Sequence, residues 1–179
     1  MKQEKHTWPT KNTTVWLPAN VYDSAIIGRN CSIGMFCEVG HKVIIGDNVR
    51  VGAHSFIPEG VTIEDDVFIG PNVTFTNDCY PPSPKEDWQK IRVCKGASIG
   101  AAVTIVCGRT GVTIGEKALV GAGSVVTRDI PAGETWSGVP ARKHIKDSSQ
   151  LSARSSKEDQ KKQLLTAKSL QLSAQSKEE

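Results

Sequence analysis

The chain has 179 residues, a formal net charge of +3 and a pI near 8.6, which suits one domain with a short appendage. Its basic residues are scattered and no apolar run approaches the ~20 residues of a membrane-spanning helix, so neither nucleic acid nor a membrane is expected as a partner. The five cysteines include no CxxC pair and follow no secretory leader, which predicts a protein of the reducing cytoplasm.

After a lead-in of residues 1–14, an apolar residue recurs at every sixth position. These positions are Val15, Val21, Ile27, Ile33, Val39, Ile45, Val51, Ile57, Ile63, Ile69 and Phe75. A fixed short period is typical of a solenoid. The next residue is often glycine, as at Gly28, and we expect it to relieve backbone strain at a corner between short strands. Three strands would form one triangular coil of 18 residues, with parallel strands about 4.8 Å apart along the axis.

Two interruptions break this rhythm. Residues 77–92 are rich in proline and charge, so they must loop out before the pattern resumes at Val93. The later step from Ile105 to Ile114 takes nine residues, because Arg109, Thr110 and Gly111 intervene. Interruptions in a solenoid are where function is usually placed. We therefore expect an all-β parallel helix over residues 15–146 with a loop insertion at 77–92.

The remaining residues, 147–179, are dominated by Ser, Lys, Gln and Glu. This composition predicts a polar C-terminal tail. A short helix over about residues 156–174, where a few leucines offer an apolar side, is the alternative.

Three polar residues of the repeats are candidates for chemistry. Glu59 and Asn77 each follow an inward position by two residues and lie 18 residues apart, so they should stack on successive coils. His54 follows Val51 by three residues, so it should approach a corner and face outward. We expect the three side chains to gather near one edge at the root of the loop, although a histidine in a repeat can also be purely structural.

The repeat pattern, spanning Val15 to Arg142, resembles the hexapeptide acyltransferase superfamily, whose fold is a left-handed parallel β-helix. The segment from Val51 to Asp78, which ends in Phe-Thr-Asn-Asp, is similar to the nucleotide-linked amino-sugar N-acetyltransferases. Segments 95–108 and 118–131, and Gly-Val-Pro-Ala-Arg at 138–142, also resemble that family. The resemblance implies acetyl-CoA as co-substrate, a UDP- or dTDP-linked amino sugar for surface glycans as acceptor, and a homotrimer with shared active sites.

This chain departs from the family pattern at both interruptions. The family loop commonly continues to Tyr-Pro-Arg, whereas here Pro82 follows Tyr80 and Pro81. The family also commonly runs from Cys-Gly directly into the next Val-Thr-Ile-Gly, without the three residues 109–111. These departures affect an expected sugar or diphosphate contact and the coenzyme contacts expected near Gly108.

Acetyl transfer to an amine needs a positioned neutral amine, donors for the developing oxyanion and a path for one proton. We expect direct attack without a protein nucleophile and without a metal. The expected roles are as follows: catalytic, His54 and Asn77; substrate-binding, Glu59, Asp78 and Tyr80; coenzyme-binding, Gly100, Ala101, Ala122, Arg128, Arg142 and Lys143.

Other reactions remain as alternatives. A covalent acyl-enzyme on Cys107 is disfavoured, because that thiol lies in an apolar run. An O-acetyltransferase would need His54 as a true base, because a hydroxyl is a poor nucleophile. A γ-type carbonic anhydrase would need three histidine ligands, whereas only His41 and His54 lie inside the repeats. A noncatalytic scaffold is the last alternative.

Overall fold

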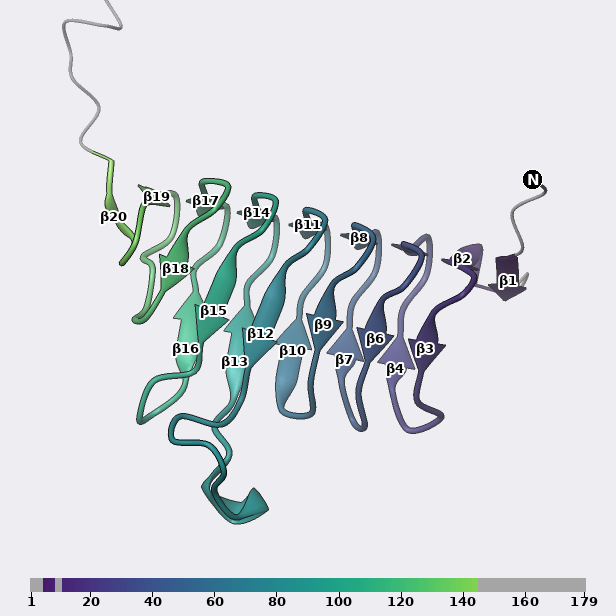
Figure 1. Ribbon diagram of the computed structural model, residues 1–179. Helices are drawn as coiled ribbons and strands as arrows, with labels where there is room; N and C mark the ends of the chain where they lie inside the picture. The colour runs from purple at the N-terminus through teal and green to yellow at the C-terminus, as the bar shows by residue number, and fades with distance from the viewer. Residues whose placement is uncertain (1–4, 9–10, 145–179) are drawn as a thin grey trace, which may run out of the picture. The chain divides into compact units, whose positions relative to one another are not determined.

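The computed structural model describes residues 5–8 and 11–144, with the side chains of 5–8 excepted. These residues form a left-handed parallel β-helix, which confirms the predicted fold class (Figure 1). The expected polar tail at 147–179, with its alternative helix, lies outside the described residues. No helix in the described part is long and apolar enough to cross a membrane.

Three sheets run along the helix. The first contains β1 (Lys5–Trp8), β2 (Thr13–Trp16), β5 (Ser32–Ile33), β8 (Arg50–Val51), β11 (Phe68–Ile69), β14 (Ser98–Ile99), β17 (Leu119–Val120), β19 (Thr135–Ser137) and β20 (Arg142–Lys143). The second contains β3 (Asn20–Val21), β6 (Glu38–Val39), β9 (Phe56–Ile57), β12 (Thr74–Thr76), β15 (Thr104–Val106) and β18 (Val125–Val126). The third contains β4 (Ile26–Ile27), β7 (Ile44–Ile45), β10 (Val61–Ile63), β13 (Ile91–Val93) and β16 (Val112–Ile114).

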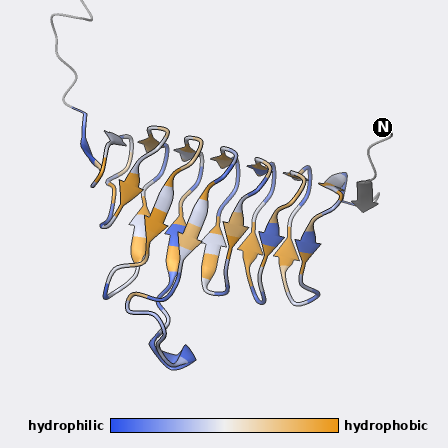
Figure 2. Cartoon of the chain, viewed as in Figure 1, coloured by the Kyte–Doolittle hydropathy of each residue, from blue (hydrophilic) through white to orange (hydrophobic). Residues whose placement is uncertain are grey.

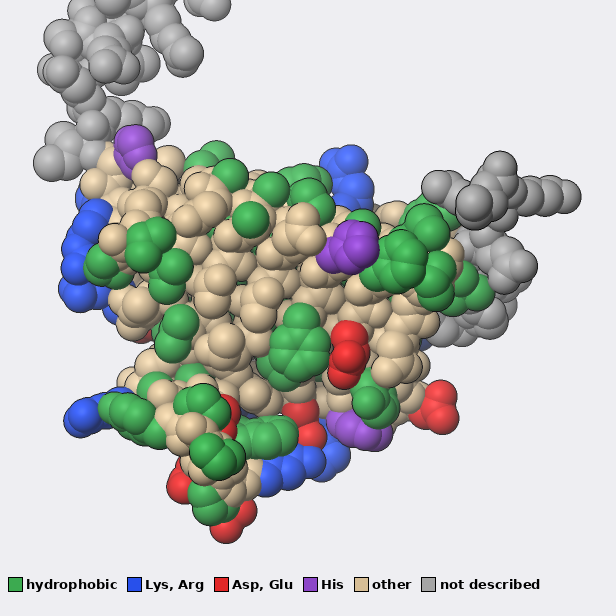
Figure 3. All heavy atoms as spheres, viewed as in Figure 1, with side chains coloured by type: hydrophobic (Ala, Val, Ile, Leu, Met, Phe, Trp, Pro, Cys, Tyr) green, Lys and Arg blue, Asp and Glu red, His purple; other side chains and the backbone are tan. Residues whose placement is uncertain are grey.

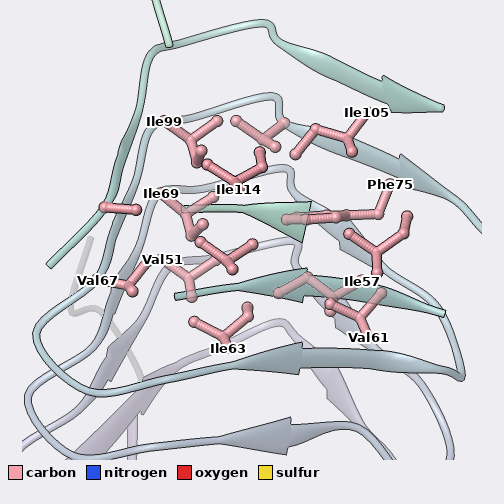
Figure 4. Packing of buried hydrophobic residues seen from close by; sticks show 14 of the residues in the cluster. Val51, Ile57, Val61, Ile63, Val67, Ile69, Phe75, Ile99, Ile105 and Ile114 are labelled. Atoms are coloured by element: carbon pink, nitrogen blue, oxygen red, sulfur yellow. The ribbon is translucent and has the colours of Figure 1, made fainter. Parts of the chain in front are cut away.

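The inward residues of the sixfold repeat stack in columns inside the coil. Ile57 and Phe75 belong to one column, continued by Ile105, and each is fully buried (Figure 4). A second column holds Val51 and Ile69 (Figure 4). Because each strand pairs with the strand one coil away, the core is one continuous stack along the axis.

The corners carry backbone strain at a position other than the one expected. Ten non-glycine residues of the described part have positive φ, and nearly all lie three residues after an inward position, as Phe36 (φ 59°) and His54 (φ 61°) do. The glycine directly after the inward residue has a steric role instead. A Cβ on Gly52 would lie 2.4 Å from the backbone nitrogen of Pro71 in the next coil. The close stacking of coils, and not strain relief, therefore requires glycine there.

We name the corners by the sheets that they join. The first corner follows the first-sheet strands (34–36, 52–54, 70–72, 100–102, 121–123), the second corner follows the second-sheet strands (22–24, 40–42, 58–60), and the third corner follows the third-sheet strands (28–30, 46–48, 64–66). An amide ladder stabilises the third corner: Asn12 donates to Asn30 (3.1 Å), Asn30 to Asn48 (3.1 Å) and Asn48 to Asp66 (2.9 Å). Asparagine tolerates left-handed backbone better than most residues, which explains its recurrence there.

The two sequence interruptions are accommodated as predicted. Ile63 pairs with Val93, so the coil that contains the first interruption is 30 residues long, and Val93 pairs with Ile114 across the second. A third irregularity was missed: Ile114 bridges to Ile130, which leaves a coil of only 16 residues.

The first interruption forms an arm (residues 77–90) between β12 and β13. It contains the 3-10 helix η1 (Lys85–Asp87) and is closed at its root by the Gln89 amide, which donates to the Asn77 carbonyl at 2.7 Å. The arm projects from the side of the coil and is largely hydrophilic (Figures 1 and 2). Most of its side chains lie at the surface, while Asn77 at its root is buried and Cys79 packs against the core.

Candidate active site

Six of the expected site residues divide between two corners. His54, Gly100, Ala101 and Ala122 lie on the first corner. Glu59 lies on the second corner, after β9, and Asn77 lies above it at the end of β12. Since β9 runs between the two corners, the expected gathering of His54 with Glu59 and Asn77 is wrong within one chain. The sixfold phase places His54 before the second-sheet strand and the other two after it.

His54 is an exposed corner residue. Its ring stacks on Phe36, one coil earlier, with ring centroids 4.8 Å apart and planes inclined by 16°. Its amide donates to the Met35 carbonyl at 2.9 Å. No described residue forms a hydrogen bond with the His54 ring, so both ring nitrogens are available to a ligand or to another subunit.

Glu59 and Asn77 stack as predicted. The Asn77 side-chain amide donates to the Glu59 carbonyl at 2.8 Å, and Asn77 is only 9% exposed. The stack continues downward to His41, which lies 18 residues before Glu59 and two after the inward Val39. Sequence reasoning missed His41 as a member of this column, although the 18-residue spacing was the signal that identifies it.

His41, Glu59 and Asn77 form what we call the polar column. This column borders a hollow of about 240 Å³ on the second sheet and second corner. Its lining residues are Tyr22, Glu38, Gly40, His41, Phe56, Pro58, Glu59, Asn77, Lys85 and Trp88. Lys85 and Trp88 come from the arm, which therefore forms one wall of the hollow. Charged side chains gather where the arm meets the coil (Figure 3). Aromatic faces beside charged groups suit a polar ligand that also carries a ring.

Glu59 is held by two lysines. Lys85 Nζ lies 2.6 Å from one carboxylate oxygen, and Lys42 Nζ lies 3.6 Å from the other. The hydrogen bond from Lys85 is the main cause that lowers the pKa of Glu59, so this carboxylate is ionised at neutral pH. The Lys85–Glu59 pair also ties the arm to the coil.

His41 is oriented by its neighbours on the second corner. Its Nδ1 lies 3.0 Å from the Ser24 hydroxyl, which also accepts the Lys42 amide at 3.2 Å. Its ring centroid lies 4.1 Å from that of Tyr22. Within the described residues no partner contacts Nε2. One nitrogen is thus fixed and the other is free to exchange a proton with a bound molecule.

Asp78 acts inside the arm. Its carboxylate accepts hydrogen bonds from the Tyr80 amide (3.0 Å), from the Ser83 amide (2.9 Å) and from the Ser83 hydroxyl. The hydroxyl bond is the largest of the causes that lower the pKa of Asp78. These contacts explain how Asp78 shapes the turn, while its expected contact with substrate stays a prediction.

Tyr80 is 64% exposed, and its hydroxyl accepts a hydrogen bond from Arg109 Nε at 2.9 Å. The two interruptions of the repeat therefore contact each other.

The basic residues expected near the coenzyme lie on two segments near the C-terminal end of the coil. Arg128 is exposed and follows β18, whereas Arg142 and Lys143 lie on β20 at the end of the first sheet. Lys143 is paired with Glu134, and Arg142 donates to the Ala141 carbonyl at 2.8 Å.

The Cys107 thiol is fully buried, as expected, and burial raises its pKa to about 11. A protonated, inaccessible thiol does not support an acyl-enzyme. Among the described residues, no group of three His, Cys, Asp or Glu side chains is placed to hold a metal ion.

The triangular coil of six-residue repeats is the architecture of a hexapeptide-repeat protein. Two family models match the chain: "Bacterial transferase hexapeptide (six repeats)" at residues 24–59, and "Hexapeptide repeat of succinyl-transferase" at 42–77 and 91–128. The chain belongs to this family of hexapeptide-repeat transferases.

Two curated relatives are similar over part of their length. The dTDP-3-amino-3,6-dideoxy-alpha-D-galactopyranose 3-N-acetyltransferase of Aneurinibacillus thermoaerophilus is 56% identical over 57 residues, 32% of this chain and 28% of the relative. The galactoside O-acetyltransferase of Escherichia coli (strain K12) is 39% identical over 90 residues, 46% of this chain and 42% of the relative. The chain thus spans less than half of the length of either.

Solved structures share the fold. AntD, an N-acyltransferase from Bacillus cereus solved as a mutant with dTDP and coenzyme A, has a TM-score of 0.66 at 24% identity, covering 84% of this chain and 90% of that one. The acetyltransferase domain of PglB from Neisseria gonorrhoeae, in complex with acetyl coenzyme A, has a TM-score of 0.62 at 25% identity, covering 74% and 57%.

Proposed function

We propose that the protein transfers an acetyl group from acetyl-CoA to the amine of a UDP- or dTDP-linked amino sugar for surface-glycan biosynthesis. The observation that carries this proposal is the 56% identity over 57 residues with a dTDP-amino-sugar N-acetyltransferase. The hollow supports it, because its aromatic and charged lining suits a sugar nucleotide. All cysteines in the described part are free thiols, in keeping with a cytoplasmic enzyme.

The acceptor amine belongs beside the column of His41, Glu59 and Asn77. The Oδ1 atom of Asn77 has no hydrogen-bond partner among the described residues, because Nδ2 makes the contact to Glu59. This oxygen can accept an N–H of the amine and orient its lone pair. The amine attacks the thioester carbonyl, the C–S bond breaks, and the surplus proton passes to His41, to His54 or to the departing thiolate.

The first corner is suited to the slender pantetheine arm of the co-substrate. From coil to coil it presents small side chains at Ala101, Ala102 and Ala122, and a Cβ added at Gly123 would meet nothing within 4 Å. Backbone groups at Gly100, Ala101 and Ala122 can pair with the pantetheine amides. Arg128, Arg142 and Lys143 are the cations we assign to the coenzyme phosphates.

We further propose a homotrimer. One chain carries His54 and the small-residue corner apart from the arm and its hollow, so a site that uses both needs two chains. Closed cyclic symmetry would bring the first corner of one subunit to the second corner of the next without leaving an open filament. Light scattering of the purified protein measures this directly, and a monomer that turns over fully would refute it.

The function is tested by incubating the protein with acetyl-CoA and a panel of UDP- and dTDP-linked 3-amino and 4-amino sugars, following thiol release and product mass. Turnover of one amine fixes the reaction class. In the same assay, His41→Asn and His54→Asn separate the two histidines: a true base loses about 10²-fold or more in kcat. Asparagine tolerates the left-handed backbone at position 54, so that variant keeps the corner.

The second candidate is an O-acetyltransferase, favoured by the 39% identity with the galactoside enzyme. Turnover of a sugar hydroxyl, with no amine in the panel acetylated, would select it. A hydroxyl is a weaker nucleophile than an amine, so this reaction also requires a histidine base.

A further inference from the structure

The two insertions of this chain contact each other. The arm lies between β12 and β13, and residues 109–111 lie between β15 and β16, one coil further along the axis. Arg109 Nε donates to the Tyr80 hydroxyl at 2.9 Å, and its guanidinium carbon lies 5.9 Å from the centroid of the Tyr80 ring. The hydrogen bond is also the main cause that raises the pKa of Arg109.

The second insertion is a tight turn that fixes where Arg109 can point. Gly108 and Gly111 have positive φ (62° and 87°), and Arg109 bridges to Gly111. A Cβ on Gly111 would lie 2.6 Å from the carbonyl oxygen of Lys90, the last residue of the arm. The amide of Val112 donates to the same carbonyl at 3.1 Å. The turn is therefore packed against the end of the arm.

The arm is tied by polar side chains on two sides. On one side Lys85 pairs with Glu59 and, with Trp88, lines the hollow beside the column. On the other side Tyr80 bonds to Arg109, and both residues line a second hollow of about 250 Å³. Loss of the Arg109 contact would leave the side-chain ties on the column side, namely the Lys85–Glu59 pair and the Asn77 amide on the Glu59 carbonyl.

We propose that Arg109 is a positioning residue for the acceptor: it holds Tyr80, and through it the arm, so that Lys85 and Trp88 stay over the hollow. This inference rests on the proposed function only in naming the amino-sugar nucleotide as the molecule that occupies that hollow. The insertion at 109–111 is on this account part of the acceptor site, although Arg109 need not touch the acceptor.

The test compares Arg109→Ala, Tyr80→Phe and the double variant. A hydrogen bond from a charged donor is worth enough to expect that each single variant raises KM for the acceptor about tenfold, while KM for acetyl-CoA stays within about twofold. Because both act through one contact, the double variant should be no worse than either single variant. Arg109→Lys should rescue part of the loss. Arg29→Ala, which removes an exposed guanidinium bonded to Asp47 on the third corner, is the matched control and should change neither KM.

Losses that multiply in the double variant would overturn the inference, because Arg109 would then act independently of Tyr80, for example on an acceptor phosphate. Unchanged acceptor KM in Arg109→Ala would also overturn it. Hydrogen exchange without substrates keeps the inference separate from the proposed function. The Ser83 and Gln89 amides, bonded within the arm, should exchange faster in Arg109→Ala even if no amino sugar is acetylated. Unchanged exchange would refute the inference that the Arg109–Tyr80 contact holds the arm.

Discussion

Replacing Asn77 by aspartate tests the buried contact that joins the column to the arm. The Asn77 amide donates to the Glu59 carbonyl at 2.8 Å, and a carboxylate in its place has no hydrogen to donate. The change removes a hydrogen bond and sets a charge against a carbonyl oxygen at a site only 9% exposed. Together these effects should lower the free energy of unfolding by about 2–4 kcal/mol at neutral pH.

The pH dependence of this variant has a definite sign. Burial and the facing carbonyl raise the pKa of the introduced carboxyl in the folded state. The variant therefore loses the most unfolding free energy at pH values above that raised pKa. The loss shrinks as pH falls toward the unfolded pKa of about 4, because a protonated carboxyl can donate a hydrogen bond.

The assay is urea unfolding of Asn77→Asp and of the unmodified protein at one protein concentration between pH 4 and 8. Asn72→Asp is the control, since Asn72 is exposed and aspartate also tolerates its left-handed backbone. We expect that control to change stability by less than about 0.5 kcal/mol. Equal stability of Asn77→Asp and the unmodified protein at pH 7 would refute the reasoning.

Three further predictions follow from the core, the arm and the corners. Phe75→Ala should cost about 3–5 kcal/mol in unfolding free energy because the ring is fully buried, whereas Phe75→Leu should cost clearly less; equal losses would contradict cavity formation. Asp78→Ala should lower the unfolding midpoint at neutral pH. The pKa of Asp78 is lowered in the folded state, so its contribution is present above about pH 4 and lost as pH falls through the folded value; a gap that widens in acid would argue against this. Gly52→Ala should cost about 1–3 kcal/mol by thermal or urea unfolding, because its Cβ would overlap the next coil; Ala53→Gly, at the same corner, is the comparison.

The sixfold period was sufficient to predict the solenoid, its core and both insertions. Each inward residue contacts its neighbours in the next coil, so the pattern repeats at the interval of the structure itself. The stack of Glu59 on Asn77 followed from the same interval, and the interval would also have identified His41. The 16-residue coil before Ile130 was not predicted, although Ile130 follows Val126 by four residues and not by six.

The placement of His54 shows the limit of spacing alone. Counting residues places it near Glu59, but a corner and a strand lie between them, and only the three-sided course of the chain separates the two residues. The role of glycine was also misjudged. Sequence indicates that the position needs glycine, but the distance to the next coil decides that the reason is steric.

By itself the sequence determined the coil, its period and the residues that fill it, because these depend on local contacts repeated at a fixed interval. Only the tertiary structure decided that Arg109 meets Tyr80, that Lys85 reaches Glu59 and that His54 and Glu59 occupy different corners. These contacts join segments whose separation in sequence follows no repeat. Their geometry is set by how the insertions fold back on the coil, which no periodic pattern encodes.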